Sequence, residues 1–228
     1  MLTEILTLSI VGLILAFAYK KKKIDKSAVI LTTIIGFSCL LFGNIYLVML
    51  LLAFFIPGNL VSMYERKRKK EIGCEQKIRT WKNVYGNGMA AMLWSICNFI
   101  FPNPIWLYTM YSSLACATAD TFATEIGQLS RKKPRLITTL KEVNPGTAGA
   151  ISLDGIYAAG IGSLLITSPL LLIHHEFWIL IFICSIIGSL FDSLLGATAE
   201  QRGWINTHDI NFLTTMTSGI LFFILVFI

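Results

Sequence analysis

Hydrophobic residues recur in eight long runs separated by short polar connections. Each run approaches the roughly 20 residues that a helix needs to cross the hydrocarbon core of a bilayer. Backbone polar groups in lipid must pair within their own segment, so we predict that these runs are helices. The predicted spans are Leu2–Tyr19, Ser27–Phe42, Asn44–Met63, Gly86–Phe101, Ile105–Glu125, Thr147–Ile173, Phe177–Thr198 and Ile210–Ile228.

The boundary between the second and third spans is the least marked. The run from 27 to 63 is too long for one span and breaks most naturally at Gly43-Asn44. We therefore predict an all-α, polytopic transmembrane bundle of about eight spans, or seven if spans two and three merge or one is re-entrant. The predicted organisation is a single integral membrane domain, 1–228, with three N-terminal helices (1–63), a basic cytoplasmic loop (64–85) and a five-helix catalytic core (86–228).

Positive charges alternate with the predicted spans. All 19 Lys and Arg residues fall within 20–26, 66–82, 131–141 or at position 202, which are the connections after spans one, three, five and seven. The other connections carry none. Because basic connections favour the cytoplasmic side, we expect a cell-membrane protein with both termini outside. The first run has the length of a signal peptide, but its lysines follow the apolar core, so we expect it to remain as a helix.

The composition excludes several classes of function. Hydrophobic residues make up 55% of the chain, and a net charge of +6 is explained by the cytoplasmic loops and anionic headgroups without a nucleic-acid partner. The five cysteines form no C-x-x-C pair, which argues against a zinc or redox site. No Walker-type glycine loop and no G-x-S-x-G occurs, so the soluble nucleotide-binding folds receive no support.

Three acids interrupt the hydrophobic spans near their predicted cytoplasmic ends. They are Asp120, Glu125 and Asp192. Ionisable groups at membrane depth are costly and usually serve an ion, a substrate or a proton. Carboxylates suit Mg²⁺, which binds hard oxygen ligands together with phosphate and water. The alternative is that these acids are solvated at the interface or paired with Arg and Lys.

A Pro-Gly turn leads into the sixth predicted span. In Asn144-Pro145-Gly146-Thr147, Thr147 is a candidate N-cap, and free N–H groups at a helix start favour a phosphate. An ordinary capped turn is the alternative. Asp154, predicted to lie about two turns into this span, faces either the site or a partner in the bundle. The predicted phosphate- and nucleotide-binding residues are Arg79, Asn87, Thr121, Thr124, Arg135, Lys141, Pro145, Gly146, Thr147, Gly149 and Ser193.

Several sequence blocks together resemble one family of integral membrane proteins. They are Arg79-Thr80-Trp81 with Asn87-Gly88, Ala117 through Asp120-Thr121 to Glu125-Ile126-Gly127, Pro134-Arg135-Leu136-Ile137-Thr138-Thr139, Pro145-Gly146-Thr147 with Gly149, Gly188-Ser189 through Asp192-Ser193 to Thr198, and Asn211-Phe212-Leu213. The family includes plant phytyl-phosphate kinase and uncharacterised archaeal and animal transmembrane proteins. The resemblance covers roughly residues 79–220, and the first three helices carry no signature.

The resemblance implies a kinase that transfers a phosphoryl group from a nucleoside triphosphate to an isoprenoid monophosphate, phytyl or geranylgeranyl, giving the diphosphate. CTP is the favoured donor because related phytol and dolichol kinases use it, and Mg²⁺ is the implied cofactor. Asp120 and Asp192 are then expected to be metal ligands, and Glu125 a ligand or a water-positioning group. Arg79 is expected to neutralise charge that develops on the phosphates.

Two other functions remain open at this stage. Intramembrane acids and small-residue helix faces also fit a transporter or flippase for an anionic lipid or an ion. A scaffold in a membrane complex would use the same residues for helix packing. The partners expected for the kinase are a nucleoside triphosphate, a prenyl phosphate lipid and the membrane, and a homodimer is compatible with the sequence.

Overall fold

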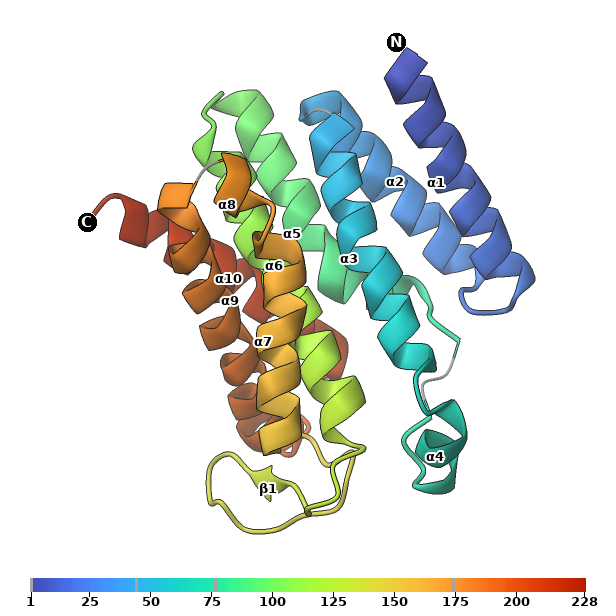
Figure 1. Ribbon diagram of the computed structural model, residues 1–228, viewed down its shortest axis with the longest axis vertical. Coiled ribbons are helices and arrows are strands. Elements are labelled where there is room, and N and C mark those ends of the chain that lie inside the picture. The colour runs from blue at the N-terminus through green and yellow to red at the C-terminus, as the bar shows by residue number, and fades with distance from the viewer. Residues whose placement is uncertain (1, 44, 76–77, 174) are drawn as a thin grey trace.

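The computed structural model describes residues 2–43, 45–75, 78–173 and 175–228. Within these residues the chain forms eight long helices that run alternately up and down (Figure 1). The long helices are α1 (Leu2–Lys20), α2 (Lys26–Phe42), α3 (Ile45–Met63), α5 (Trp81–Ile100), α6 (Ile105–Gly127), α7 (Leu153–Thr167), α9 (His175–Leu195) and α10 (Thr207–Val226). Shorter elements are α4 (Arg66–Glu71), α8 (Leu170–Ile173), β1 (Arg135–Leu136), β2 (Ala150–Ile151) and a π-helical turn at Gly196–Glu200. The predicted helical membrane fold is confirmed.

Both chain ends lie at one end of the bundle, and the basic connections lie at the other. In Figure 1 the N-terminus is at the top and the C-terminus at the left in the upper half, whereas α4 and the β1 loop are at the bottom. By length and apolarity, three helical stretches within the described residues qualify as membrane spans: Ile45–Met63, Glu176–Glu200 and Thr207–Val226. The stretches Thr7–Lys20, Lys26–Phe42 and Leu153–Thr167 are apolar but shorter. The arrangement agrees with the alternating charges, and the cytoplasmic assignment of the basic end stays a prediction.

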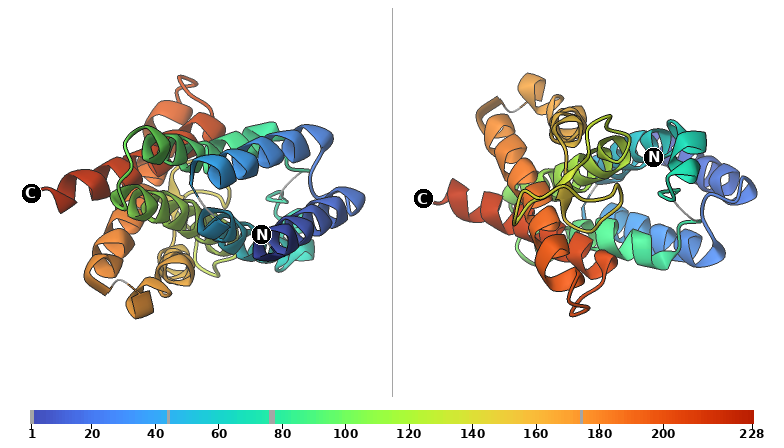
Figure 2. Two further views of the ribbon diagram at one scale, coloured as in Figure 1. Left: turned by 90° about the horizontal axis from the view of Figure 1, so that it is seen from above. Right: turned by 90° about the horizontal axis from the view of Figure 1, so that it is seen from below.

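Helix α6 lies at the centre of the bundle. Seen along the helix axes, α1 and α2 lie at one end of an elongated cross-section and α7–α10 at the other, with α5 and α6 between them (Figure 2). Small residues allow this packing: a Cβ added to Gly162 of α7 would lie 2.8 Å from the Thr118 carbonyl oxygen on α6. Ser113 of α6 accepts a hydrogen bond from the Trp94 indole at 2.9 Å and donates to the Thr215 carbonyl at 2.8 Å. Polar side chains therefore join α5, α6 and α10 inside the bundle, as expected for membrane helices.

Two helix starts, those of α5 and α7, lie furthest from the predicted spans. Helix α5 begins at Trp81 rather than Gly86, because Thr80 and Asn83 form a capping box. Helix α7 begins at Leu153 with Ser152 as its N-cap, so the prediction that Thr147 caps this helix is wrong. Asp154 accordingly lies in the first turn of α7, where it is exposed, rather than two turns inside.

The segment before α7 is not helical for a physical reason. Gly146 and Gly149 have φ values of 82° and 75°, in the left-handed region that glycine adopts without strain. Ala150–Ile151 then pairs antiparallel with Arg135–Leu136. The all-α prediction missed this two-stranded sheet, because strands of two residues show no periodicity. At the other boundaries, Asn206 caps α10, which starts at Thr207, and Asn44 lies outside the described residues.

Candidate functional site

Two cavities meet at the basic end of the bundle. The first, which we call the N-terminal cavity, has a volume of about 260 Å³ and is bounded by α1, α2, α3, α5, α6, α9 and α10. The second, which we call the loop cavity, has a volume of about 230 Å³ and lies between α6, α7, α9 and the loop 146–152. Both cavities are lined by Asp120, Thr124, Asp192 and Thr207. The two predicted metal-binding aspartates therefore lie between two separate spaces.

The two cavities differ in chemistry. Apolar residues of α1–α3 line much of the N-terminal cavity, and its polar end is formed by Arg79, Asn83, Asn87 and the acids. One side of the loop cavity is lined by small and hydroxyl-bearing residues, Gly146, Thr147, Ala148, Gly149, Ser189, Ser193 and Gly196, and the rest includes the apolar Ile151, Ile156, Ile186 and Leu190. An amphiphile matches the first cavity, and a polar ligand approached by backbone groups matches the second.

Asp192 and Asp120 differ in their hydrogen bonding. Thr214 donates a hydrogen bond to Asp192 Oδ2 at 3.2 Å. Asn211, with its amide turned so that the nitrogen faces the carboxylate, donates to the same oxygen at 3.3 Å. Within the described part of the chain, the Asp120 carboxylate takes part in no hydrogen bond or salt bridge. A half-buried carboxylate of this kind, beside a second one, is suited to a cation.

The donor set fits Mg²⁺ better than a transition metal. Among the described residues, no group of three or more His, Cys, Asp or Glu side chains comes together. Zinc sites in proteins need three or four such ligands, whereas Mg²⁺ is usually held by one or two carboxylates together with water and substrate phosphates. Asp120 of α6 and Asp192 of α9 are the two carboxylates that would hold such an ion.

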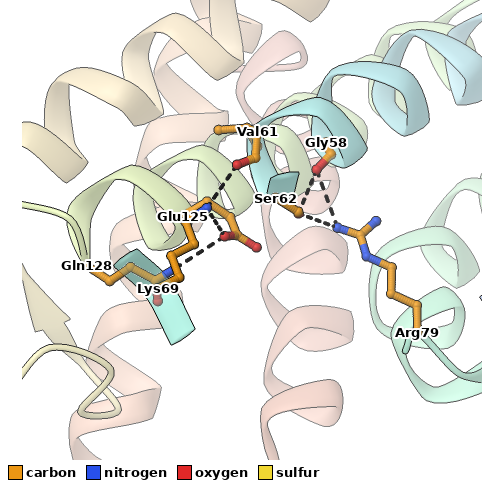
Figure 3. A network of polar contacts seen from close by, with 7 residues as sticks. All are labelled: Gly58, Val61, Ser62, Lys69, Arg79, Glu125 and Gln128. Atoms are coloured by element: carbon orange, nitrogen blue, oxygen red, sulfur yellow. Dashed lines mark hydrogen bonds and ion pairs between the residues drawn. The ribbon is translucent and has the colours of Figure 1, made fainter. Parts of the chain in front are cut away.

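The third predicted acid, Glu125, is engaged in a buried ion pair (Figure 3). Lys69 Nζ lies 2.6 Å from Glu125 Oε2, and the two side chains are 1% and 6% exposed. Lys69 also donates to the Val61 carbonyl at 3.0 Å, and Gln128 donates to Glu125 at 3.2 Å. Through these contacts Lys69 connects α4 to Val61 of α3 and to Glu125 of α6. Glu125 also lines the N-terminal cavity, and its metal-binding role stays a prediction.

Arg79 is fixed at the polar end of the N-terminal cavity. Its guanidinium donates to Ser62 Oγ at 2.8 Å and to the Gly58 carbonyl at 3.4 Å, both on α3 (Figure 3). Its backbone bonds to the α1–α2 turn, through Arg79 N–H to the Lys23 carbonyl and Asp25 N–H to the Arg79 carbonyl, each at 3.0 Å. Burial lowers the pKa of Arg79, and the nearby Glu125 charge opposes that shift. A guanidinium stays protonated in proteins, so Arg79 is a fixed cation beside the acids.

The loop of the second cavity is held against the π-helical turn by a close glycine contact. A Cβ added to Gly149 would lie 2.3 Å from the Ala197 nitrogen. Gln201 donates to the Ala148 carbonyl at 2.9 Å, and Thr147 Oγ1 donates to the Asn144 carbonyl at 2.7 Å. The backbone around Gly149 is therefore positioned by contacts on both sides.

We expect Gly149→Ala to destabilise the protein and to reduce its activity. The added methyl would combine a left-handed backbone penalty of roughly 1–2 kcal/mol with an overpacking penalty of about 1–3 kcal/mol. Gly203→Ala is the matched control, because Gly203 also has a positive φ of 71° but a Cβ there would meet nothing within 4 Å. Thermal unfolding in detergent should show the larger loss for Gly149→Ala. Equal losses for the two variants would contradict the close contact.

Most predicted site residues line one of the two cavities, and three do not. Arg79, Asn87, Thr121 and Glu125 line the N-terminal cavity, whereas Gly146, Thr147, Gly149 and Ser193 line the loop cavity. Asp120, Thr124 and Asp192 line both. Arg135, Lys141 and Pro145 line neither cavity. Arg135 is exposed and lies 3.7 Å from Glu142 across the loop, and Lys141 is also exposed.

Sequence reasoning gave no site role to several residues that line the cavities or pair with a residue that does. Thr207 and Asn211 of α10 line the N-terminal cavity, and Glu200 lines the loop cavity, where Thr207 donates a hydrogen bond to it. Lys69 was grouped with the basic loop. A usable signal for α10 was the i, i+4 spacing of Thr207 and Asn211 on the same predicted side as the acids. Nothing in the run Arg66–Lys70 distinguishes Lys69 from its neighbours.

These features define a class: an integral membrane helix bundle whose polar residues gather around two cavities at one end. A family model described as "Integral membrane protein DUF92" matches residues 9–219. The chain belongs to this family, which confirms the family relationship predicted from its motifs.

Relatives from several organisms cover most of the chain. "Uncharacterized membrane protein MJ0933" of Methanocaldococcus jannaschii is 39% identical over 214 residues, 91% of this chain and 88% of the relative. "Protein PGR" of Arabidopsis thaliana is 29% identical over 232 residues, 88% and 80% of the two chains. "Protein VTE6, chloroplastic" of Arabidopsis thaliana is 26% identical over 180 residues, 72% and 53% of the two chains. No solved structure matches the chain.

Proposed function

We propose that this protein is a Mg²⁺-dependent membrane kinase. It transfers a phosphoryl group from a nucleoside triphosphate, with CTP favoured, to an isoprenoid monophosphate, giving the diphosphate. One observation carries the proposal: Asp120 and Asp192 lie where a cavity with an apolar end meets a second cavity that glycines and hydroxyl-bearing residues help to line. A reaction between a lipid and a water-soluble phosphate donor needs this division of space. The membership of a family that includes plant phytyl-phosphate kinase supports the same reaction.

The cavity chemistry favours one assignment of the two substrates. The acceptor binds in the N-terminal cavity, with its phosphate beside Arg79 and the acids. The triphosphate of the donor binds in the loop cavity, where small residues let the backbone approach it. The two phosphates then meet at Asp120, Thr124 and Asp192, which both cavities share.

The residues present are sufficient for this chemistry, because phosphoryl transfer depends mainly on positioning and on charge neutralisation. The bond between the γ-phosphorus and the β,γ-bridging oxygen breaks, and an acceptor phosphate oxygen bonds to the γ-phosphorus. The nucleoside diphosphate leaves with the bridging oxygen. A phosphate monoester is already anionic, so no strong general base is required. Asp120 and Asp192 would hold Mg²⁺, which supplies charge neutralisation on the phosphates when bound, and Arg79 adds a fixed positive charge.

We expect purified protein to form a labelled diphosphate from geranylgeranyl or phytyl monophosphate and a γ-labelled nucleotide in the presence of Mg²⁺. A panel of CTP, ATP, GTP and UTP identifies the donor, and omission of Mg²⁺ should stop the reaction. Independently, a nucleotide present at 100 times its Kd should stabilise the native protein by about 2.7 kcal/mol. No product with any nucleotide or prenyl chain would reject the proposal. Flux of an anionic lipid in proteoliposomes without nucleotide would indicate a transporter instead.

A further inference from the structure

The first three helices, most of which lie within the range that the family model matches, build the apolar part of the candidate site. Within the N-terminal cavity, apolar lining residues come from α1 (Val11, Ile14, Leu15) and from α3 (Val48 to Phe55), with Ile35 from α2. The residues that line the polar end come largely from α5, α6, α9 and α10. One cavity therefore joins two parts of the chain with different chemistry.

The cavity extends from the polar end toward the opposite end of the bundle. Arg79 marks the polar end, since it pairs with the α1–α2 turn and contacts Ser62 near the end of α3. Val48 lies in the first turn of α3, at the far end of that helix. At 1.5 Å per residue, the lining from Val48 to Phe55 covers roughly 10 Å along α3. The apolar part is thus elongated along the membrane normal, as a hydrocarbon chain requires.

The occupant that this cavity fits is a single-chain lipid with an anionic head. The head is matched by the Arg79 cation and by a cation held at the acids, and the tail by the apolar lining. A volume of about 260 Å³ is small beside the roughly 300–1,000 Å³ of ordinary ligand pockets, so two acyl chains fit poorly.

We infer that α1–α3 form a tail chamber that sets the longest isoprenoid the enzyme accepts, with Gly36 at the position that limits its length. This inference rests on the proposed kinase function. It adds a specificity determinant in helices where the sequence shows no motif.

Gly36 is suited to this role because space is open beside it. A Cβ added there would meet nothing within 4 Å, and the residue lines the cavity. Gly36 lies ten residues beyond Lys26, the first residue of α2, which places it about 15 Å along the axis from the level of the Arg79 contact. A larger side chain at this position enters the chamber without displacing packed atoms.

The test replaces Gly36 by leucine and measures turnover of geranyl, farnesyl, geranylgeranyl and phytyl monophosphate. The ratio of kcat/KM for geranylgeranyl over geranyl phosphate should fall by about tenfold or more, equivalent to about 1.4 kcal/mol. Gly12→Leu is the matched control, because a Cβ at Gly12 also meets nothing within 4 Å but Gly12 does not line the cavity. Its ratio should match that of the unmodified protein. Phe54→Ala, which removes a ring from the lining, should shift the preference toward longer chains.

The outcomes test the tail chamber independently of the proposed kinase reaction. An active protein whose chain-length ratio is unchanged in both Gly36→Leu and Phe54→Ala overturns the chamber and leaves the kinase in place. A second readout does not need turnover: a prenyl phosphate with a photoreactive tail should crosslink to α1–α3, as mapped by mass spectrometry. Crosslinks there in a protein inactive with every nucleotide support the chamber and reject the kinase. Three results would overturn the chamber. They are crosslinks confined to α7 or α9, crosslinking that only a two-chain phospholipid competes away, and no crosslinks at all.

Discussion

Asparagine at position 120 or 192 is expected to reduce phosphoryl transfer by more than about 100-fold. Substitution of residues that merely support metal ligands already reduces affinity or activity by about 10- to 100-fold, and the ligands themselves matter more. The fold should persist, because asparagine keeps the size of the side chain and its amide oxygen can still accept the hydrogen bond from Thr214 at position 192. Activity at saturating CTP and a titration with Mg²⁺ measure the effect, and thermal unfolding checks the fold.

Asp154→Asn is the control for these two variants. Asp154 lies in the first turn of α7, is exposed and lines neither cavity, so its removal should leave turnover within about twofold if surface changes are generally small. If Asp120→Asn and Asp192→Asn retain the activity of Asp154→Asn, the two aspartates do not hold the metal and the kinase site lies elsewhere.

The second large effect is expected at the Lys69–Glu125 ion pair. Lys69→Met leaves the Glu125 carboxylate buried without its cation, which costs about 3–5 kcal/mol in comparable buried pairs. The double variant Lys69→Met/Glu125→Met removes both charges and should recover most of that loss, because apolar replacements of buried pairs are often neutral or stabilising. Thermal unfolding of detergent-solubilised protein measures both changes.

A more exposed pair between the first residue of α4, Arg66, and Glu75 beyond the end of that helix supplies the control. Arg66 lies 2.7 Å from Glu75, and their side chains are 56% and 31% exposed. Arg66→Met should therefore change stability by no more than about 1 kcal/mol. Equal stability of Lys69→Met and Arg66→Met would show that the buried pair contributes nothing. The double variant also tests Glu125 itself: a stable protein without activity would indicate a direct role in metal binding or water positioning.

Charge and hydropathy were sufficient to predict the helices and their alternation. Span limits in α2, α3 and α6 agree with the structure within two residues, because a bilayer imposes a length and excludes unpaired backbone. Asp120 and Asp192 were recognisable as candidate site residues for a related reason. A carboxylate within an apolar run is energetically costly and usually serves an ion, a substrate or a proton. Both line the shared part of the two cavities.

Local backbone geometry and long-range pairing were not predictable in the same way. The start of α7 was misplaced because the residues after Thr147 are small and apolar, whereas Gly149 has a positive φ and Ala150 pairs with Leu136. Lys69 was indistinguishable from other basic loop residues, because its partner Glu125 lies 56 positions away. A contact of that kind depends on how α4 folds back against α6. No local pattern in the sequence around Lys69 indicates it.

The hydrogen bonds between the α1–α2 turn and Arg79 bear on how the protein is made. Arg79 is anchored by residues near the start of the chain, and Asp192 is held by Thr214 and Asn211 of the last helix. A ribosome-bound intermediate that has inserted only part of the chain accordingly lacks one wall of the reaction centre. The residues after Met63 are therefore not expected to form the site by themselves, and the proposed phosphoryl transfer is expected only once the whole polypeptide has been synthesised.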